Sequence, residues 1–208
     1  MNIKKTLVLS ALLALVIAGA YFLYGYLSEN YAGDRISIIE EEAEVTKSDG
    51  TEPEEKSENS EEVSYLAPDF TVTDMDGNSV SLSDKFGKPI IVNFWASWCP
   101  PCKSEMPDFE EAFKEYGNEI TFMMVNMTGG RETVDSAKSF IEKSTYSFPV
   151  YFDTEYQAAM TYGVSSIPQT IFIDKDGNLT AYAQGMIDKN ALDTGIGMIY
   201  NTNTTITK

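Results

Sequence analysis

The sequence predicts an α/β domain in which helices flank a mixed central sheet, preceded by a β-hairpin extension and by one membrane-spanning helix. Three observations support this prediction. Short apolar runs separated by turn signals begin at Ala67, a pattern typical of one compact domain. These runs begin in the order β-α-β and end as a hairpin followed by a helix, which gives a mixed sheet with helices on both faces. A long uncharged run precedes them at residues 7–27.

The N-terminal run has the length and the flanks of a membrane anchor. Lys4 and Lys5 precede it, and its uncharged residues reach the roughly 30 Å of a bilayer core at ~1.5 Å per residue. The preceding lysines favour a cytoplasmic N-terminus, with the rest of the chain outside a bacterial cell. We therefore expect residues 1–28 to form an uncleaved, single-pass signal-anchor. Cleavage after the small residues at 18–20 is the alternative, and it also places the domain outside the cytoplasm.

Residues 29–64 are expected to be a disordered acidic linker, because they hold few apolar side chains and like charges repel one another. The stretch 28–64 carries 13 acidic and 3 basic residues, more than half of the chain's net charge of −17. It serves either as a spacer or as a connection with no further role. Ile36–Ile39 is expected to add a short helical turn. The acidity of the chain argues against nucleic acid as a partner.

The elements of the predicted domain, 65–200, follow from apolar runs and turn residues. Asp76-Gly77-Asn78 separates two short apolar runs and is typical of a hairpin turn. The continuous apolar run Ile90–Trp95 is typical of a strand that is buried on both faces. We expect strands at 70–73, 80–82, 90–95, 120–127, 150–152, 170–173 and 179–184, helices at about 99–116, 131–143, 156–162 and 188–200, and a polar tail at 201–208.

Cys99 and Cys102 are the candidate reactive residues, because they follow a buried strand directly and open a predicted helix. Unpaired N–H groups and the helix dipole at that place favour an anion, and the thiolate is the attacking species in disulfide exchange. Pro100 suits the first helical position, where its missing N–H is not needed. Cys102, one turn further, is close enough to form a disulfide with Cys99 and is expected to be the better buried, resolving thiol.

The cysteine pair has two other interpretations. A structural disulfide across two residues closes a very small loop, worth only ~2 kcal/mol in the loop-entropy model. Half of a zinc site needs two further ligands, and the chain has two cysteines and no histidine. We expect neither a metal nor a cofactor. The absence of histidine also leaves proton transfer to carboxylates, lysine, tyrosine or water.

The stretch Asn93–Cys102 (NFWASWCPPC), followed by Glu105, Pro107 and Phe109, resembles the TlpA/ResA-like branch of the thioredoxin superfamily. The opening 67–70 and the hairpin resemble the N-terminal extension of that group, and 166–170 resembles the superfamily's cis-proline loop. The similarity spans about 65–200. It implies a thioredoxin fold and dithiol–disulfide exchange. It further implies that Ile167–Pro168 is a cis peptide bond beside the cysteine pair, where the Ile167 backbone binds an extended substrate.

Glu105 is the candidate proton carrier. Thioredoxins have a buried aspartate where this chain has Asn93, whereas the branch it resembles often has a glutamate three residues after the second cysteine. Burial near two sulfurs would raise the pKa of Glu105 enough for it to carry the proton of Cys102. The alternative is that Glu105 is a first-turn acid stabilised by the helix dipole.

Three further side chains shape the predicted site. Trp98 is expected to shield the cysteines and contact partners, and Pro101 to shape the loop with Pro100. Trp95 is expected in the core, as are the methionines at 123, 124 and 127.

The sequence therefore predicts an extracytoplasmic oxidoreductase that exchanges disulfides with partner proteins. Cys99 is expected to attack and Cys102 to resolve the mixed disulfide. The resemblance favours reduction, with electrons from a membrane thiol donor and with apocytochrome c as one substrate class. The alternatives are a thiol-dependent peroxidase, a copper-binding module of the same fold, and a partner-docking module without redox turnover.

Overall fold

The computed structural model of the protein describes residues 17–19, 36–38 and 65–200. Residues 36–38 and 65–200 lie in one compact unit and residues 17–19, which are helical, in another. The strands are β1 Ile36–Ile38, β2 Thr71–Thr73, β3 Ser79–Ser81, β4 Ile90–Trp95, β5 Thr121–Asn126, β6 Val150–Phe152, β7 Gln169–Ile173 and β8 Leu179–Gln184. The helices are η1 Ser83–Lys85, α2 Pro100–Tyr116, α3 Val134–Glu142, α4 Gln157–Thr161 and α5 Lys189–Ile199.

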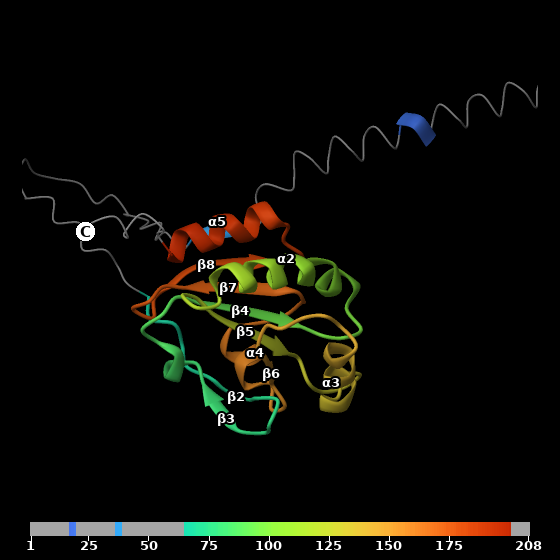
Figure 1. The fold of residues 1–208 in the computed structure, drawn as a ribbon, viewed down its shortest axis with the longest axis horizontal. Coiled ribbons are helices and arrows are strands. Elements are labelled where there is room, and N and C mark those ends of the chain that lie inside the picture. The colour runs from blue at the N-terminus through green and yellow to red at the C-terminus, as the bar shows by residue number, and fades with distance from the viewer. Residues whose placement is uncertain (1–16, 20–35, 39–64, 201–208) are drawn as a thin grey trace, which may run out of the picture. The chain divides into compact units, whose positions relative to one another are not determined.

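The strands of the described residues form one mixed sheet in the order β1-β8-β7-β4-β5-β6-β2-β3 (Figure 1). β4, β5 and β6 run parallel, and β7, β8 and the hairpin β2–β3 pair antiparallel. β4 is central, and all six of its residues are buried. The active-site candidates follow its carboxyl end, because α2 begins five residues after Trp95.

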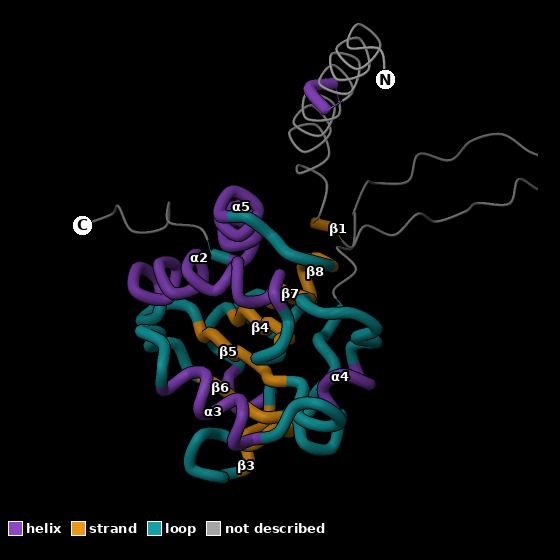
Figure 2. The backbone as a smooth tube through the Cα atoms, turned by 90° about the vertical axis from the view of Figure 1, so that its right-hand side faces the viewer, coloured by secondary structure: helices purple, strands orange, loops and turns teal. Residues whose placement is uncertain are grey.

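Helices cover both faces of the sheet, as predicted (Figure 2). Under α2, α3 and α5, one core contains Trp95, Met106 and Phe109. A second core on the other face contains Phe94 of β4, Phe70 beside the hairpin and Ala158 of α4. Alternate residues of β4 point to opposite cores, which explains why its sequence is apolar without a break.

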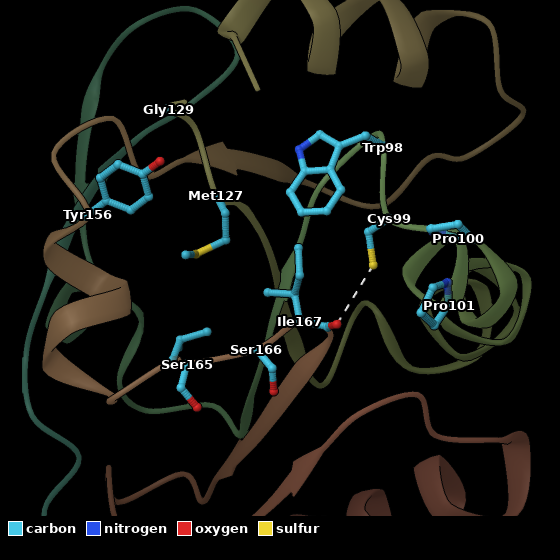
Figure 3. A pocket seen from close by; sticks show the side chains of 11 residues that line it. Trp98, Cys99, Pro100, Pro101, Met127, Gly129, Tyr156, Ser165, Ser166 and Ile167 are labelled. Atoms are coloured by element: carbon cyan, nitrogen blue, oxygen red, sulfur yellow. Dashed lines mark hydrogen bonds between the residues drawn. The ribbon is translucent and has the colours of Figure 1, made fainter. Parts of the chain in front are cut away.

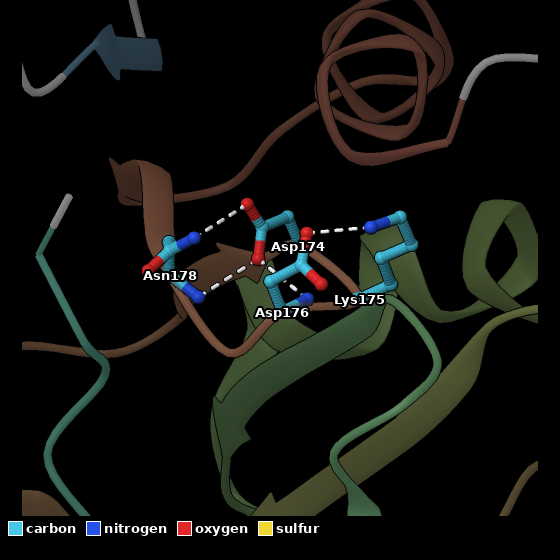
Figure 4. A network of polar contacts seen from close by, with 4 residues as sticks. All are labelled: Asp174, Lys175, Asp176 and Asn178. Carbon is cyan, nitrogen blue, oxygen red and sulfur yellow. Dashed lines mark hydrogen bonds and ion pairs between the residues drawn. The ribbon is translucent and has the colours of Figure 1, made fainter. Parts of the chain in front are cut away.

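Two hairpins turn through the same five-residue motif, Asp-x-Asp-Gly-Asn. In the second, Oδ1 of Asp174 accepts hydrogen bonds from the N–H groups of Asp176 and Asn178, at 2.9 and 2.8 Å (Figure 4). The Asn178 side chain donates to the other carboxylate oxygen at 3.0 Å. Gly177 has a φ of 87°, a conformation that favours glycine. The first turn, at 74–78, repeats these bonds.

The predicted elements of the domain agree with the structure in type, and their bounds differ by at most three residues. One expectation is wrong: residues 36–38 form an extended strand rather than a helical turn, and Ile36 pairs with Ala183 of β8. Their alternation of apolar and polar residues suits a strand that completes a sheet edge.

The other predictions about the termini concern residues outside the described ranges. Only 17–19 of the expected anchor, 36–38 of the expected linker and none of the tail are described. Within the described part of the chain, no helix is both long and apolar enough to cross a membrane.

Candidate active site

Cys99 is the N-cap of α2, as the sequence predicts. Its backbone is extended, and the N–H of Cys102 points to its sulfur at 3.2 Å. Pro100 and Pro101 occupy the first two helical positions, where an N–H would have no partner within the helix. Cys99 and Cys102 form a disulfide, and both are buried. The helix start therefore directs an N–H group and its positive dipole end at Cys99.

The cis-proline loop lies against Cys99. The Ile167–Pro168 peptide bond is cis, as the resemblance implies. The carbonyl oxygen of Ile167 lies 3.9 Å from Sγ of Cys99 (Figure 3). These residues are 68 positions apart in the sequence and are brought together by the β4–β7 pairing. The sulfur of Cys99 thus lies between backbone polar groups from the start of α2 and from the cis-proline loop.

A cavity of about 410 Å³ opens in front of Cys99. Trp98, Pro100 and Pro101 line one side, and the other side carries Met127 and Ile167 (Figure 3). The remaining lining residues are Gly129, Tyr156, Val164, Ser165 and Ser166. Cys102 does not line the cavity. Of the two sulfurs, that of Cys99 therefore faces the cavity, and the division of roles between the two cysteines stays a prediction.

Glu105 is buried at the base of the site, with 1% of its surface exposed. Its Oε1 accepts a hydrogen bond of 2.8 Å from Nδ2 of Asn93, and its Oε2 accepts one of 3.0 Å from the N–H of Ile187. Glu105 follows Cys102 by three positions on α2, so both side chains lie on the same face of the helix. The carboxylate therefore joins the central strand, the helix and the loop after β8.

Burial raises the pKa of Glu105 to about 7, although the hydrogen bonds from Ile187 and Asn93 oppose the shift. The alternative explanation of Glu105, a first-turn acid held by the helix dipole, is wrong. The first turn of α2 contains no acidic residue, and Glu105 lies in the second turn, facing the core. A group with this pKa can both hold and release a proton near neutral pH.

Asn93 belongs to the hydrogen-bond network of Glu105, and its residue type alone does not predict this role. Its Nδ2 donates to Thr170 at 3.1 Å as well as to Glu105, while its Oδ1 has no hydrogen-bond partner. The amide therefore acts as a donor to the carboxylate. A buried acid at this position would instead repel Glu105.

Glu132 is another buried carboxylate, and the sequence does not single it out. It precedes α3 and is 1% exposed. The backbone N–H of Ser97 donates to Oε2, and Oε1 accepts from the Ser97 hydroxyl at 3.0 Å and from the hydroxyl of Ser136. Glu132 thus holds the segment that leads into Cys99. An acid in a polar loop carries no signal of such a contact, because its partner is 35 positions away.

Trp98 stands at the mouth of the cavity, with 43% of its surface exposed. The guanidinium carbon of Arg131 lies 4.0 Å from the centroid of its ring, a cation–π geometry. Trp95 is fully buried and packs against Phe140, as expected. The methionines at 123 and 124 are core residues, but Met127 is only partly buried and lines the cavity, so its assignment to the core was incomplete.

Within residues 65–200 and the two short described segments, no group of three or more His, Cys, Asp or Glu side chains could hold a metal ion. The charged side chains around the cysteine pair instead form hydrogen bonds and ring contacts with the protein itself.

Residues 63–182 match the AhpC/TSA family. A thiol-disulfide oxidoreductase ResA of Bacillus thuringiensis is 37% identical over 135 residues, which cover 64% of this chain and 75% of the relative. Thioredoxin-like protein YneN of Bacillus subtilis is 33% identical over 127 residues, or 61% of this chain and 74% of the relative. The family match includes residues 65–182 of the described domain.

A solved structure with the same fold is a thiol:disulfide interchange protein of Chlorobium tepidum, at 28% identity and a TM-score of 0.58. The match covers 65% of this chain and 96% of that one. The exposed lipoprotein thioredoxin of Streptococcus pneumoniae is 34% identical with a TM-score of 0.55, over 62% of this chain and 98% of the other. Both likenesses confirm the thioredoxin-like arrangement of a mixed sheet and flanking helices.

Proposed function

Because the chain belongs to the AhpC/TSA family and is a protein thiol–disulfide oxidoreductase of the ResA type, we propose that it reduces partner disulfides outside the cytoplasm. The observation that carries this proposal is the position of Cys99, which caps α2 and lines the cavity, with Cys102 behind it. A sulfur that lines a cavity at a helix N-terminus is suited to attack, and a neighbouring thiol outside that cavity is suited to resolve.

The reaction consists of two exchanges. The thiolate of Cys99 attacks one sulfur of the partner's disulfide, and the other partner sulfur leaves as a thiolate. Cys102 then gives its proton to Glu105 and attacks the sulfur of Cys99, which releases the second partner thiolate. The partner gains two electrons, and the Cys99–Cys102 pair loses two and becomes the disulfide seen in the structure.

The location and the electron donor are part of this proposal. The uncharged N-terminal run after Lys4 and Lys5 supports a single-pass anchor with the catalytic domain outside. In that setting a membrane thiol donor returns the disulfide to the dithiol form. The substrate class that we propose to test first is the pair of heme-binding cysteines of an apocytochrome c.

The reduction potential of the full-length protein tests the direction of electron flow. We would equilibrate the Cys99–Cys102 pair with a thiol buffer at pH 7 and measure the fraction oxidised. A value near the ~−270 mV of thioredoxin supports a reductant, whereas one near ~−120 mV indicates an oxidant and contradicts the proposal. Consumption of peroxide with a steady thiol supply would instead identify the peroxidase alternative.

Trapping distinguishes the two cysteines. The variant Cys102→Ser should accumulate a mixed disulfide between Cys99 and an oxidised apocytochrome c peptide, because the resolving thiol is absent. Cys99→Ser should accumulate none, since Cys102 does not line the cavity. The opposite pattern would reverse the assigned roles.

A further inference from the structure

The turn that precedes α3 contacts two neighbouring residues of the segment that leads into α2. Two backbone hydrogen bonds, of 2.9 and 3.0 Å, close this turn between Gly129 and Glu132. Glu132 is buried and accepts hydrogen bonds from Ser97. Arg131, which precedes Glu132, places its guanidinium over the ring of Trp98, the residue after Ser97. A closed turn and a buried anchor therefore hold Arg131 at the mouth of the cavity.

The guanidinium of Arg131 keeps its hydrogen-bond donors available. The residue is exposed, and within the described part of the chain its side chain forms no hydrogen bond and no ion pair. The ion pairs among these residues instead join Lys114, Lys175 and Lys189 to acidic neighbours. A guanidinium carries its N–H donors on its edge, whereas stacking on a ring uses only its face. The edge of Arg131 is thus free to donate to another molecule.

This cation lies beside the reactive sulfur. Trp98, whose ring centroid is 4.0 Å from the guanidinium carbon, directly precedes Cys99, and both residues line the cavity of about 410 Å³ (Figure 3). The chain as a whole carries a net charge of −17, so it repels an acidic partner at long range. The attraction of one cation is local, because salt screens exposed charges beyond about 8 Å. Arg131 therefore acts on groups that are already close to the cavity.

We propose that Arg131 binds a carboxylate of the partner protein, on a glutamate or aspartate within three residues of the partner's reacting cysteine. The inference deepens the proposed function and rests on it. Two N–H groups of a guanidinium match the two oxygens of a carboxylate. The mixed disulfide fixes the partner's cysteine at Cys99, and three residues of extended chain span about 10 Å. Arg131 is thus a specificity-determining residue, and it takes no part in the exchange of electrons.

Peptide disulfides test this inference with the full-length protein. The host peptide contains one cysteine among glycine and serine residues and is supplied as its disulfide-linked dimer. A glutamate, a glutamine or a lysine replaces one serine, at one, two or three residues before or after the cysteine. The measured quantity is the second-order rate constant at which the reduced protein reduces each peptide. The acid preference is this rate constant for a glutamate peptide divided by that for the matching glutamine peptide.

We expect an acid preference of about fivefold at one of these positions at low ionic strength, the upper end of the usual effect of an exposed ion pair. The preference should fall below about twofold in roughly 0.5 M NaCl, because salt screens such a pair.

Substitutions of Arg131 separate its charge from any structural role. Arg131→Gln should reduce the acid preference to about one. Arg131→Glu should reverse it, so that the lysine peptide reacts about threefold faster than the glutamate peptide. Each ratio compares peptides on one variant, so a general loss of stability or of Trp98 shielding does not change it. Lys143→Gln is the matched control. Lys143 is exposed at the end of α3 and does not line the cavity, so its variant should keep the fivefold preference.

Two outcomes would contradict the inference alone. Equal rate constants for glutamate and glutamine peptides at every position would show that Arg131 binds no partner carboxylate. An acid preference that persists in both Arg131→Gln and Arg131→Glu would assign the attraction to another cation. Failure of the wild-type protein to reduce any peptide is a different result: it would contradict the proposed function itself, and with it the inference that rests on that function.

Discussion

The side-chain amide of Asn93 donates a 2.8 Å hydrogen bond to Glu105, yet the pKa of that carboxyl group is raised to about 7. Burial is the larger influence: the 1% exposed carboxylate loses more solvation than its two hydrogen bonds return. The folded protein therefore keeps a proton on Glu105 at pH values where the unfolded chain has released it.

This difference in proton binding predicts a specific dependence of stability on pH. Between pH 4.5 and 7 the folded state binds one proton more at Glu105 than the unfolded state. The contribution of Glu105 to the free energy of unfolding therefore decreases as pH rises. The shift corresponds to about 3 kcal/mol. In Glu105→Gln this dependence should vanish. The variant's free energy of unfolding should therefore rise relative to wild type by about 3 kcal/mol between pH 4.5 and pH 8.

Urea unfolding of the oxidised protein at several pH values measures the effect. The Asn93 amide can turn to present its unpaired Oδ1 to the new side-chain amide, so the variant should fold. Glu111→Gln, an exposed acid on the same helix, is the control and should follow the wild-type curve. If the free energies of unfolding of Glu105→Gln and wild type differed by the same amount at every pH, Glu105 would be ionised at pH 5, and the prediction would be wrong.

The same carboxyl group should govern the rate of disulfide exchange. When a small dithiol reduces the oxidised protein, Cys102 leaves as a thiolate and takes the proton of Glu105. Glu105→Gln should slow this reaction about 100-fold at pH 6, the lower end of the usual ~10²–10⁴ effect of a general acid. The effect should decrease above pH 7, where wild-type Glu105 has lost its proton. Stopped-flow rates between pH 5.5 and 8.5 would check this, and unchanged rates would remove Glu105 from the mechanism.

Glu132 should position the segment before Cys99. Glu132→Ala removes the acceptor of the partly buried N–H and hydroxyl of Ser97, whereas the Ser136 hydroxyl can still donate to the carbonyl of Thr133. The loss at Ser97 should destabilise the protein by roughly 1–3 kcal/mol. It should also change the rate at which iodoacetamide alkylates Cys99 in the reduced protein. Glu132→Gln keeps one acceptor oxygen and should restore most of both properties. The exposed Glu119 offers the control variant Glu119→Ala.

A loss of stability without any change in the alkylation of Cys99 would contradict this positioning role. Glu132 would then be a structural anchor for α3 alone, through its bond to Ser136.

Most of the fold could be predicted because each element carries a local signal. Ile90–Trp95 is recognisable from its unbroken apolar run, and the two hairpins from their Asp-x-Asp-Gly-Asn turns. Strand β1 could not be predicted with the same ease, because three residues in an acidic stretch form a strand only through a partner, β8, that lies about 145 positions away.

The site was predictable where a motif is contiguous and unpredictable where loops meet. Cys99, Cys102 and Glu105 share one helix, so spacing alone places them together. The contact between Glu132 and Ser97 joins two irregular loops, and no periodicity relates them. The left-handed conformation of Tyr156 is likewise imposed by its surroundings, since intrinsic preference opposes it.

Arg131 should shield the indole of Trp98 from solvent. Its guanidinium carbon lies 4.0 Å from the ring centroid, and such a contact at an exposed site is worth ~0.5–1 kcal/mol. Arg131→Ala should therefore cost little stability but increase acrylamide quenching of tryptophan fluorescence. Trp95 is fully buried, so quenching reports mainly on Trp98. The tryptophan fluorescence of Arg131→Lys should be quenched to an intermediate extent. Equal quenching in the wild-type protein and in both variants would show that the contact between Arg131 and Trp98 does not persist in solution.

The adjacent residues Gly129 and Gly130 allow a test of whether Gly129 holds the Tyr156 ring in place. Gly129 has a φ of 148°, and a Cβ there would lie 2.2 Å from the Tyr156 hydroxyl; Gly130 has a φ of 58° and open space around its Cβ position. Both alanine variants place a side chain at positive φ and stiffen the unfolded chain equally. Gly130→Ala should cost about 1 kcal/mol. Gly129→Ala should cost at least ~1 kcal/mol more, because a φ of 148° is less accessible to alanine than one of 58° and because the new Cβ meets the tyrosine ring. It should also lower kcat/KM for peptide disulfides, because it displaces a ring that lines the cavity in front of Cys99. Equal stability and equal kcat/KM in the two variants would show that Gly129 does not hold Tyr156 in place.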